Sequence, residues 1–198
     1  MRAGVALCRY GTGLLAAAAA LVLLYQGRES SPLVFVSLFL LVITITDTFY
    51  TRVPNIINLI LIITGFGFHA FSNGAAGVLI GLGGLLTGLA LLLPGYLFRM
   101  LGAGDVKAMA ALGTITGPAA VFQVFLYTSL IGGGIAAAYY LASRNILQTL
   151  KNGVGSLQKY AYTRDRYFLK PAPSNIRLPY AAAIALGYFA FINWGKII

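Results

Sequence analysis

Long apolar segments recur along almost the whole sequence and constrain its fold more than any other feature. They run over about 11–26, 32–51, 55–72, 77–98, 118–142 and 178–195, with a shorter one at about 105–116. A helix needs roughly 20 apolar residues to cross the hydrocarbon core of a bilayer. Charged residues make up only 9% of the chain, whereas a soluble domain carries about 25%. The sequence therefore predicts an all-α, polytopic membrane protein with about six to seven transmembrane helices.

Glycine, proline and small polar residues separate these segments. Pro54-Asn55 follows the second segment, the turn SNGAAG at 72–77 follows the third, and Gly117-Pro118 follows the short one. Each of these combinations favours a turn or a helix end. The short segment is only roughly 18 Å long at helical rise, which is less than the roughly 30 Å hydrocarbon core. We expect it to be a re-entrant or sunken helix.

The apolar segments extend close to both ends of the sequence, so we expect a single transmembrane domain over 1–198. The main interruption is a polar stretch over 143–177, which mixes Lys and Arg with Tyr and Phe. This stretch is expected to be a basic cytoplasmic loop. It either rests on anionic lipid headgroups or helps to dock a substrate.

The 14 Lys and Arg residues are unevenly distributed among the predicted loops. With a cytoplasmic N-terminus, all of them except Arg28 and Lys196 fall on the cytoplasmic side, as expected for membrane proteins. The net charge of +10 therefore needs no nucleic-acid partner, and the sequence contains no basic soluble domain that would bind one. We expect a multi-pass protein of the inner (cytoplasmic) membrane that is surrounded by lipid. The sequence leaves its oligomeric state open.

Aromatic residues and the single histidine fall near the predicted membrane interfaces. Trp194, Tyr188 and Tyr25 are expected to anchor helices at these interfaces. His69 lies toward the outer end of the third segment, so we expect a packed or interfacial histidine rather than a catalytic one.

Asp47 and Asp105 are two of only four acidic residues, and both lie at the ends of apolar segments, where a charge is costly. The predicted topology brings both to the cytoplasmic membrane face. Two carboxylates at one level of a helix bundle can share a proton, because like charges a few ångströms apart do not both ionise easily. The ionised one can activate water for attack on a peptide carbonyl, while the protonated one polarises that carbonyl. This is aspartic-protease chemistry, for which we expect no metal and no cofactor.

Two other interpretations also fit an aspartate pair at a membrane edge. The carboxylates can couple protons or cations in a transporter, or they can pair structurally with Arg52, Arg99 or Lys107. Transporters usually show internal repeats with helices broken at the midplane, and the sequence shows no such repeat. An ion- or proton-coupled transporter that uses Asp47 and Asp105 remains the alternative function.

Glycine is placed in two informative patterns. Gly102 and Gly104 precede Asp105 and allow a backbone without Cβ atoms to approach an extended substrate. A second set favours close packing between helices through small residues and consists of Gly77, Gly81, Gly84 and Gly88.

Three short segments carry recognisable patterns: DTFYTRVPN at 47–55, GAGDVK at 102–107 and LPYAAAIALG at 178–187. In this order they resemble the D-x4-R-[IV]-P-N, G-x-G-D-[VIL]-K and late P-[YF]-x3-[AI] elements of type IV prepilin peptidases, which are membrane aspartic proteases. Each element is weak alone, but the three in order over about 35–190 are specific. The resemblance implies a GxGD-type protease bundle in which Asp47 and Asp105 are the catalytic pair. It also implies residues that bind substrate or shape the site: Arg52, Pro54, Asn55, Gly102, Gly104 and Lys107.

The resemblance implies an endopeptidase that removes the short basic leader from prepilins or pseudopilins at the cytoplasmic face. In that family, cleavage follows a glycine just before the apolar helix of the pilin. Large members also N-methylate the new terminus and carry paired CxxC motifs, whereas the only cysteine here is Cys8, so we expect no methyltransferase activity. The compact form resembles peptidases of the tight-adherence (Flp-type) pilus system, with archaeal preflagellin-type peptidases as a near alternative.

Overall fold

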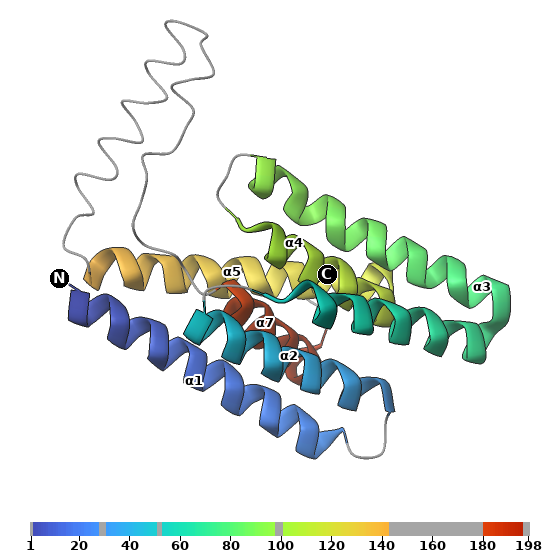
Figure 1. Cartoon of the computed structure of the whole chain (residues 1–198), viewed down its shortest axis with the longest axis horizontal. Coiled ribbons are helices and arrows are strands. Elements are labelled where there is room, and N and C mark those ends of the chain that lie inside the picture. The colour runs from blue at the N-terminus through green and yellow to red at the C-terminus, as the bar shows by residue number, and fades with distance from the viewer. Residues whose placement is uncertain (1, 28–30, 51–52, 98–100, 143–179, 196–198) are drawn as a thin grey trace, which may run out of the picture.

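The computed structural model describes residues 2–27, 31–50, 53–97, 101–142 and 180–195, and all regular structure within these ranges is α-helical. The helices are α1 (Arg2–Gln26), α2 (Ser31–Tyr50), α3 (Asn55–Leu97), α4 (Ala103–Thr116), α5 (Pro118–Ala142) and α7 (Tyr180–Trp194) (Figure 1). The predicted all-α fold class is therefore confirmed. The predicted basic loop over 143–177 lies outside the described residues.

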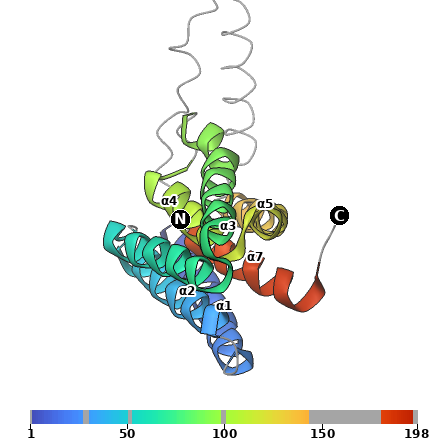
Figure 2. The same ribbon diagram turned by 90° about the vertical axis from the view of Figure 1, so that its right-hand side faces the viewer.

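The helices form one bundle with α4 and α7 in its interior. Helices α1 and α2 pack against each other on one side, α3 packs mainly on α4, and α5 packs mainly on α7. Helix α7 also contacts α1 and α2, so it joins the two sides of the bundle (Figure 2). This arrangement brings the end of α2 and the beginnings of α4 and α7 together.

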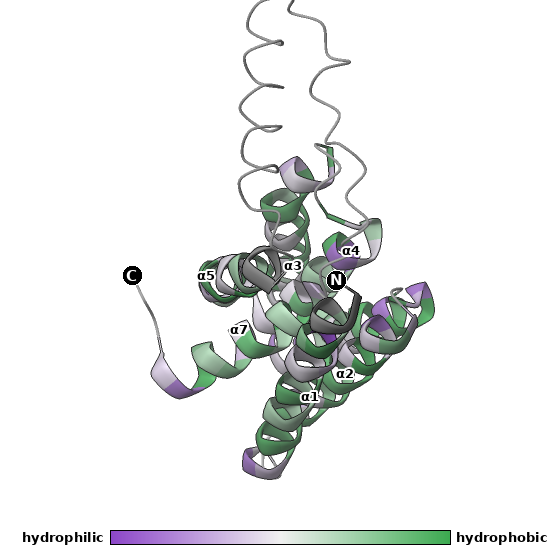
Figure 3. Ribbon diagram, turned by 90° about the vertical axis from the view of Figure 1, so that its left-hand side faces the viewer, coloured by the Kyte–Doolittle hydropathy of each residue, from purple (hydrophilic) through white to green (hydrophobic). Residues whose placement is uncertain are grey.

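The outer surface of the bundle is apolar. Many large apolar side chains are more than half exposed on it, for example Leu14, Phe71 and Leu130. Figure 3 shows apolar residues along most of the length of α1, α2 and α3. In the part of the chain that the structure describes, helices of sufficient length and hydropathy to cross a membrane are Ala6–Gln26, Pro32–Tyr50, Asn55–Leu97 and Pro118–Ala138, and α7 is a shorter apolar helix. An exposed apolar surface of this extent fits a multi-pass membrane protein.

Helix α3 consists of two limbs that meet at Gly74. The backbone of Gly74 is not helical (φ 58°, ψ −140°), a conformation that glycine adopts readily because it has no Cβ. Beyond Gly74 the chain folds back on itself. The two limbs are so close there that a Cβ on Gly77 would overlap the backbone carbonyl of His69. The two limbs, which run to the right and back in Figure 1, correspond to the predicted third and fourth segments.

Helix α4 is short and lies inside the bundle. Its 14 residues span roughly 21 Å, and nine of them, Val106 and 108–115, are buried. A helix that is buried on all sides packs against protein rather than lipid. The structure confirms a short helix at this position, and α4 begins two residues before the predicted segment.

Glycines of the second limb of α3 hold α4 at very close range. A Cβ on Gly84 would overlap the carbonyl group of Gly113, and a Cβ on Gly88 would lie 2.5 Å from the carbonyl oxygen of Met109. The contact is reciprocal, because a Cβ on Gly113 would overlap the carbonyl group of Gly84. The predicted packing through small residues is confirmed, and it connects the backbones of α3 and α4 directly.

One aromatic prediction is wrong. Trp194 and Tyr25 are 74% and 71% exposed, but Tyr188 is only 4% exposed and belongs to the core. The reason is that α7 is enclosed by α1, α2 and α5 along its middle. His69 is buried, and its Nε2 lies 3.2 Å from the carbonyl oxygen of Ile115, so it is a packed histidine as expected.

Candidate active site

The two aspartates line one pocket. This pocket has a volume of about 300 Å³ and lies between the end of α2, the segment before α3 and the beginning of α4. Its lining residues are Asp47, Val53, Asn55, Gly102, Ala103, Gly104, Asp105 and Lys107. Residues of the first two sequence motifs, separated by about 50 positions in the chain, thus share one cavity.

Asp47 is the less exposed member of the pair, and Asp105 is partly buried. Asp47 lies in the last turn of α2, its side chain is 9% exposed, and its Oδ2 accepts a hydrogen bond from the backbone N–H of Ala181 at 3.3 Å. Ala181 is the second residue of α7, where backbone N–H groups have no acceptor within the helix. The positive end of the α7 dipole therefore faces the Asp47 carboxylate and stabilises its negative charge.

Arg9 of α1 also reaches Asp47. Its Nη2 donates to the backbone carbonyl oxygen of Asp47 at 3.1 Å, and its charge acts on the Asp47 carboxyl. The sequence indicates Arg9 only as one of several basic residues on the predicted cytoplasmic side. No residue pattern around Arg9 marks this contact, which arises from the packing of α1 on α2.

Asp105 is the third residue of α4, and its carboxylate caps the beginning of the helix. Its Oδ2 accepts the backbone N–H of Gly102 at 3.2 Å, which satisfies one of the free donors at the helix start. Gly102 has no side chain, so the cap consists of this bond alone. The extended backbone of Gly102 (φ −78°, ψ 149°) turns the chain into α4.

The surroundings of Asp105 favour its protonated form. Asp105 lies outside the candidate membrane-spanning helices found among the described residues, because α4 is too short to be one of them. Burial, followed by the negative charge of Asp47, raises the pKa of Asp105 from an ordinary value of 3.8 to about 7, and the Gly102 N–H offsets part of this rise. Near neutral pH the pocket therefore holds two carboxyl groups in unequal environments, of which Asp105 more readily keeps a proton.

The remaining predicted site residues have different positions. A Cβ on Gly104 would lie 3.1 Å from the Cβ of Val53, so this glycine lets the two motifs approach closely. Lys107 donates from Nζ to Oδ1 of Asn55 at 3.1 Å, which connects the motifs again at the exposed rim. Pro54 does not line the pocket; its carbonyl accepts the N–H of Ile57 in the turn that begins α3.

The remaining motif residues are Arg52 of the first motif and the beginning of the third motif. Arg52 lies outside the described residues. From the third motif, Tyr180 and Ala181 begin α7 at the site, and Tyr180 is close enough to Asp105 for an electrostatic interaction. The sequence identified this segment as a motif but gave no reason to expect that a backbone N–H in it binds Asp47.

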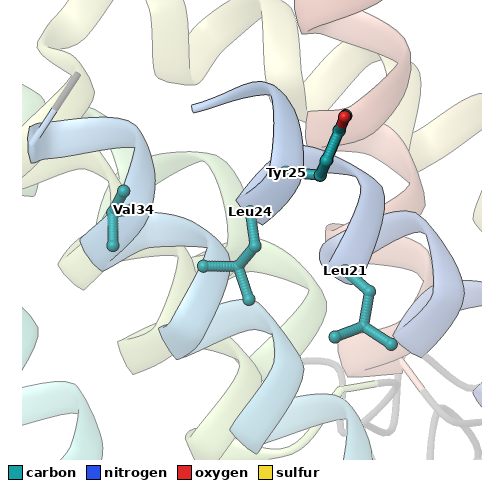
Figure 4. A pocket seen from close by; sticks show the side chains of 4 residues that line it. All are labelled: Leu21, Leu24, Tyr25 and Val34. Carbon is teal, nitrogen blue, oxygen red and sulfur yellow. The ribbon is translucent and has the colours of Figure 1, made fainter. Parts of the chain in front are cut away.

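A second and larger pocket has no comparable chemistry. It has a volume of about 480 Å³ and is lined by Leu21, Leu24, Tyr25 and Val34, at the end of the α1–α2 pair opposite Asp47 (Figure 4). Three of its four lining side chains are aliphatic. Among the described residues, no group of three or more His, Cys, Asp or Glu side chains can hold a metal ion. The aspartate pocket is therefore the candidate active site.

Comparison with known proteins matches the region of the chain that contains this pocket. The family model described as the type IV leader peptidase family matches residues 34–137, a stretch that includes Asp47, Asp105 and every other residue that lines their pocket. No curated protein and no solved structure matches the chain.

Proposed function

Because the chain belongs to the type IV leader peptidase family, we propose that it is an aspartic endopeptidase that cleaves the basic leader from prepilins or pseudopilins with Asp47 and Asp105. Family membership makes the chain a membrane peptidase with a role in pilus biogenesis. The observation that carries the aspartic mechanism is the meeting of two carboxyl groups, in unequal surroundings, in one pocket of about 300 Å³. The family match favours this function over an ion-coupled transporter.

In the proposed mechanism, ionised Asp47 is the general base and protonated Asp105 is the general acid. Asp47 accepts a proton from water as the water oxygen attacks the scissile carbonyl carbon, and Asp105 donates its proton to the carbonyl oxygen. A neutral tetrahedral diol results. The proton on Asp47 then passes to the leaving nitrogen, Asp105 takes a proton back from the diol, and the C–N bond breaks. The pair returns to its starting protonation.

The rim of the pocket suits an extended peptide. Gly102 and Ala103 are exposed there and present a backbone with almost no side chain. A peptide can approach such a backbone closely and form hydrogen bonds with it. We propose that Gly102, Gly104, Asn55 and Lys107 shape this rim, that Pro54 sets the beginning of α3, and that Arg52 contributes to the same site.

Cleavage of a cognate prepilin tests this function. Co-expression of the chain with a small protein that carries a basic leader, a glycine and then an apolar helix should yield a mature band whose N-terminus follows the glycine. A matched prepilin with that glycine replaced by valine should stay uncleaved. Cleavage should continue in excess chelator, and the mature N-terminus should carry no added methyl group.

Two results would contradict this proposal. If the precursor persists when both proteins are present in the membrane, the chain does not cleave that class of substrate. If chelator stops cleavage and zinc restores it, the metal-free mechanism is wrong.

We further propose that the pocket opens to the cytoplasmic face of the inner membrane. The distribution of Lys and Arg in the sequence supports this orientation. In a Cys8→Ala background, cysteine at Asn73, beside the bend of α3, should react with a membrane-impermeant thiol reagent added from outside. Cysteine at Ser143 or Ser156 should react only after the membrane is opened. Labelling of both regions from outside would exclude this topology.

A further inference from the structure

Arg9 binds the end of α2 that carries Asp47. The guanidinium Nη2 donates to the Asp47 carbonyl oxygen at 3.1 Å, across a separation of 38 residues in the chain. Helix α2 ends at Tyr50, so this carbonyl is one of the last four, which have no N–H partner within the helix. A cation at this position satisfies the carbonyl and interacts favourably with the negative end of the helix dipole.

A second contact fixes α1 against the same turn of α2. Gly13 lies one helical turn after Arg9 on α1, and a Cβ on Gly13 would overlap the side-chain hydroxyl of Thr48. Thr48 is the residue next to Asp47. Because glycine lets α1 approach so closely, the end of α2 lies within reach of the Arg9 side chain.

The charged and titratable groups around Asp47 come from three other helices. Arg9 comes from α1, Asp105 and Lys107 come from α4 and line the same pocket, and Tyr180 begins α7 beside Asp105. Lys107 donates to the neutral amide of Asn55. Within the described ranges, Arg9 is therefore the cation that acts on the Asp47 carboxyl.

We propose that Arg9 is a positioning residue of the aspartate pair, which caps the end of α2 and keeps Asp47 as the ionised member. This inference rests on the proposed peptidase function. It assigns different roles to two chemically identical side chains. Both carboxyl groups accept a backbone N–H at the start of a helix, and the difference is the Arg9 cation beside Asp47. Asp105 is left as the proton donor.

The test compares Arg9→Gln with Arg9→Lys. Glutamine can still donate to the Asp47 carbonyl but has no charge, whereas lysine keeps the charge on a different head group. The matched control is Arg2→Gln, which removes the other basic side chain of α1. Both variants therefore remove one positive charge from the predicted cytoplasmic side. Initial rates of prepilin cleavage are measured from acidic to alkaline pH, with the amount of each variant in the membrane determined in parallel.

We expect the acidic limb of the Arg9→Gln profile to move to higher pH by about one unit, because an opposite charge favours the ionised carboxylate. At a pH on this limb the rate falls about tenfold, and at higher pH it returns toward that of the wild type. Arg9→Lys should bring the limb back to its wild-type position, and Arg2→Gln should leave it unchanged. If Arg9→Gln does not accumulate in the membrane, Arg9→Met replaces it; this variant loses the hydrogen bond together with the charge, so the same shift of the acidic limb relative to Arg9→Lys is expected.

The other outcomes overturn the inference. A rate that falls equally at all pH values indicates that Arg9 only supports the fold, and an unchanged profile indicates that its charge does not reach the pair. An equal shift in Arg2→Gln indicates a general effect of charge on α1. These results differ from failure of the proposed function, in which the wild-type chain itself leaves the prepilin uncleaved.

Discussion

Replacement of either Asp47 or Asp105 by asparagine is expected to abolish cleavage of a cognate prepilin while leaving the protein in the membrane at wild-type amount. An amide can serve neither as general base nor as general acid, and the loss of one such group typically lowers the rate by about 10²- to 10⁴-fold. The fold should tolerate both changes, because an asparagine oxygen can still accept the N–H of Ala181 or of Gly102. The ratio of precursor to mature pilin, with membrane abundance as reference, measures the effect.

The control for this experiment is Glu29→Gln, which removes a carboxylate next to Arg28, on the predicted outer side of the membrane. It should cleave the prepilin at the wild-type rate. Mature pilin at the wild-type level from either Asp47→Asn or Asp105→Asn would exclude the aspartic mechanism. The family assignment would then need another set of catalytic residues.

A single added methyl group at Gly84 is expected to have the largest effect on the fold. A Cβ on Gly84 would overlap the carbonyl group of Gly113, and neither backbone can move without separating α3 from α4. Overpacking of a well-packed interior costs about 1–3 kcal/mol, and a backbone overlap belongs at the upper end of this range or above it. Gly84→Ala should therefore lower both thermal stability in detergent and prepilin cleavage.

The adjacent residue provides the matched control. A Cβ on Gly83 would have only the Cγ of Pro118 nearby, at 3.8 Å, which is an ordinary contact. Alanine is also favoured over glycine inside a helix by about 0.5–1 kcal/mol. Gly83→Ala should thus be neutral or slightly stabilising. Equal stability of the two variants would show that the approach of α3 to α4 is less close than described.

The sequence was sufficient to predict the elements that depend on hydropathy, turn chemistry and side-chain type. The apolar segments, the turn around Gly74, the short helix α4 and the close helix packing at the glycines of the second α3 limb all follow from such signals, whereas α4 as the partner of those glycines does not. The meeting of Asp47 and Asp105 was predicted from topology, because the C-terminal end of the second segment and the N-terminal end of the short segment fall on the same predicted membrane face. In the structure the two residues line one shared pocket, while their catalytic roles stay a proposal.

Features that depend on the packing of distant helices were not predictable in the same way. Ala181 acts through its backbone N–H, for which no side chain provides a signal. Arg9 is one of many basic residues near the membrane edge, and only the packing of α1 on α2 distinguishes it from the others. Tyr188 was assigned to an interface because hydropathy reports position along a helix and not which side of the helix is enclosed.

The glycine contacts between α3 and α4 have a consequence for how this protein can change over evolutionary time. Asp105 stands at the start of a helix whose position is set by main-chain atoms, at Gly84, Gly88 and Gly113. Main-chain contacts have no alternative rotamers, so substitutions on the lipid-facing surface have no side-chain route by which to shift α4. The outer surface is thus free to drift with the thickness and composition of the host membrane, while the placement of α4, and of Asp105 at its start, against α3 stays constant.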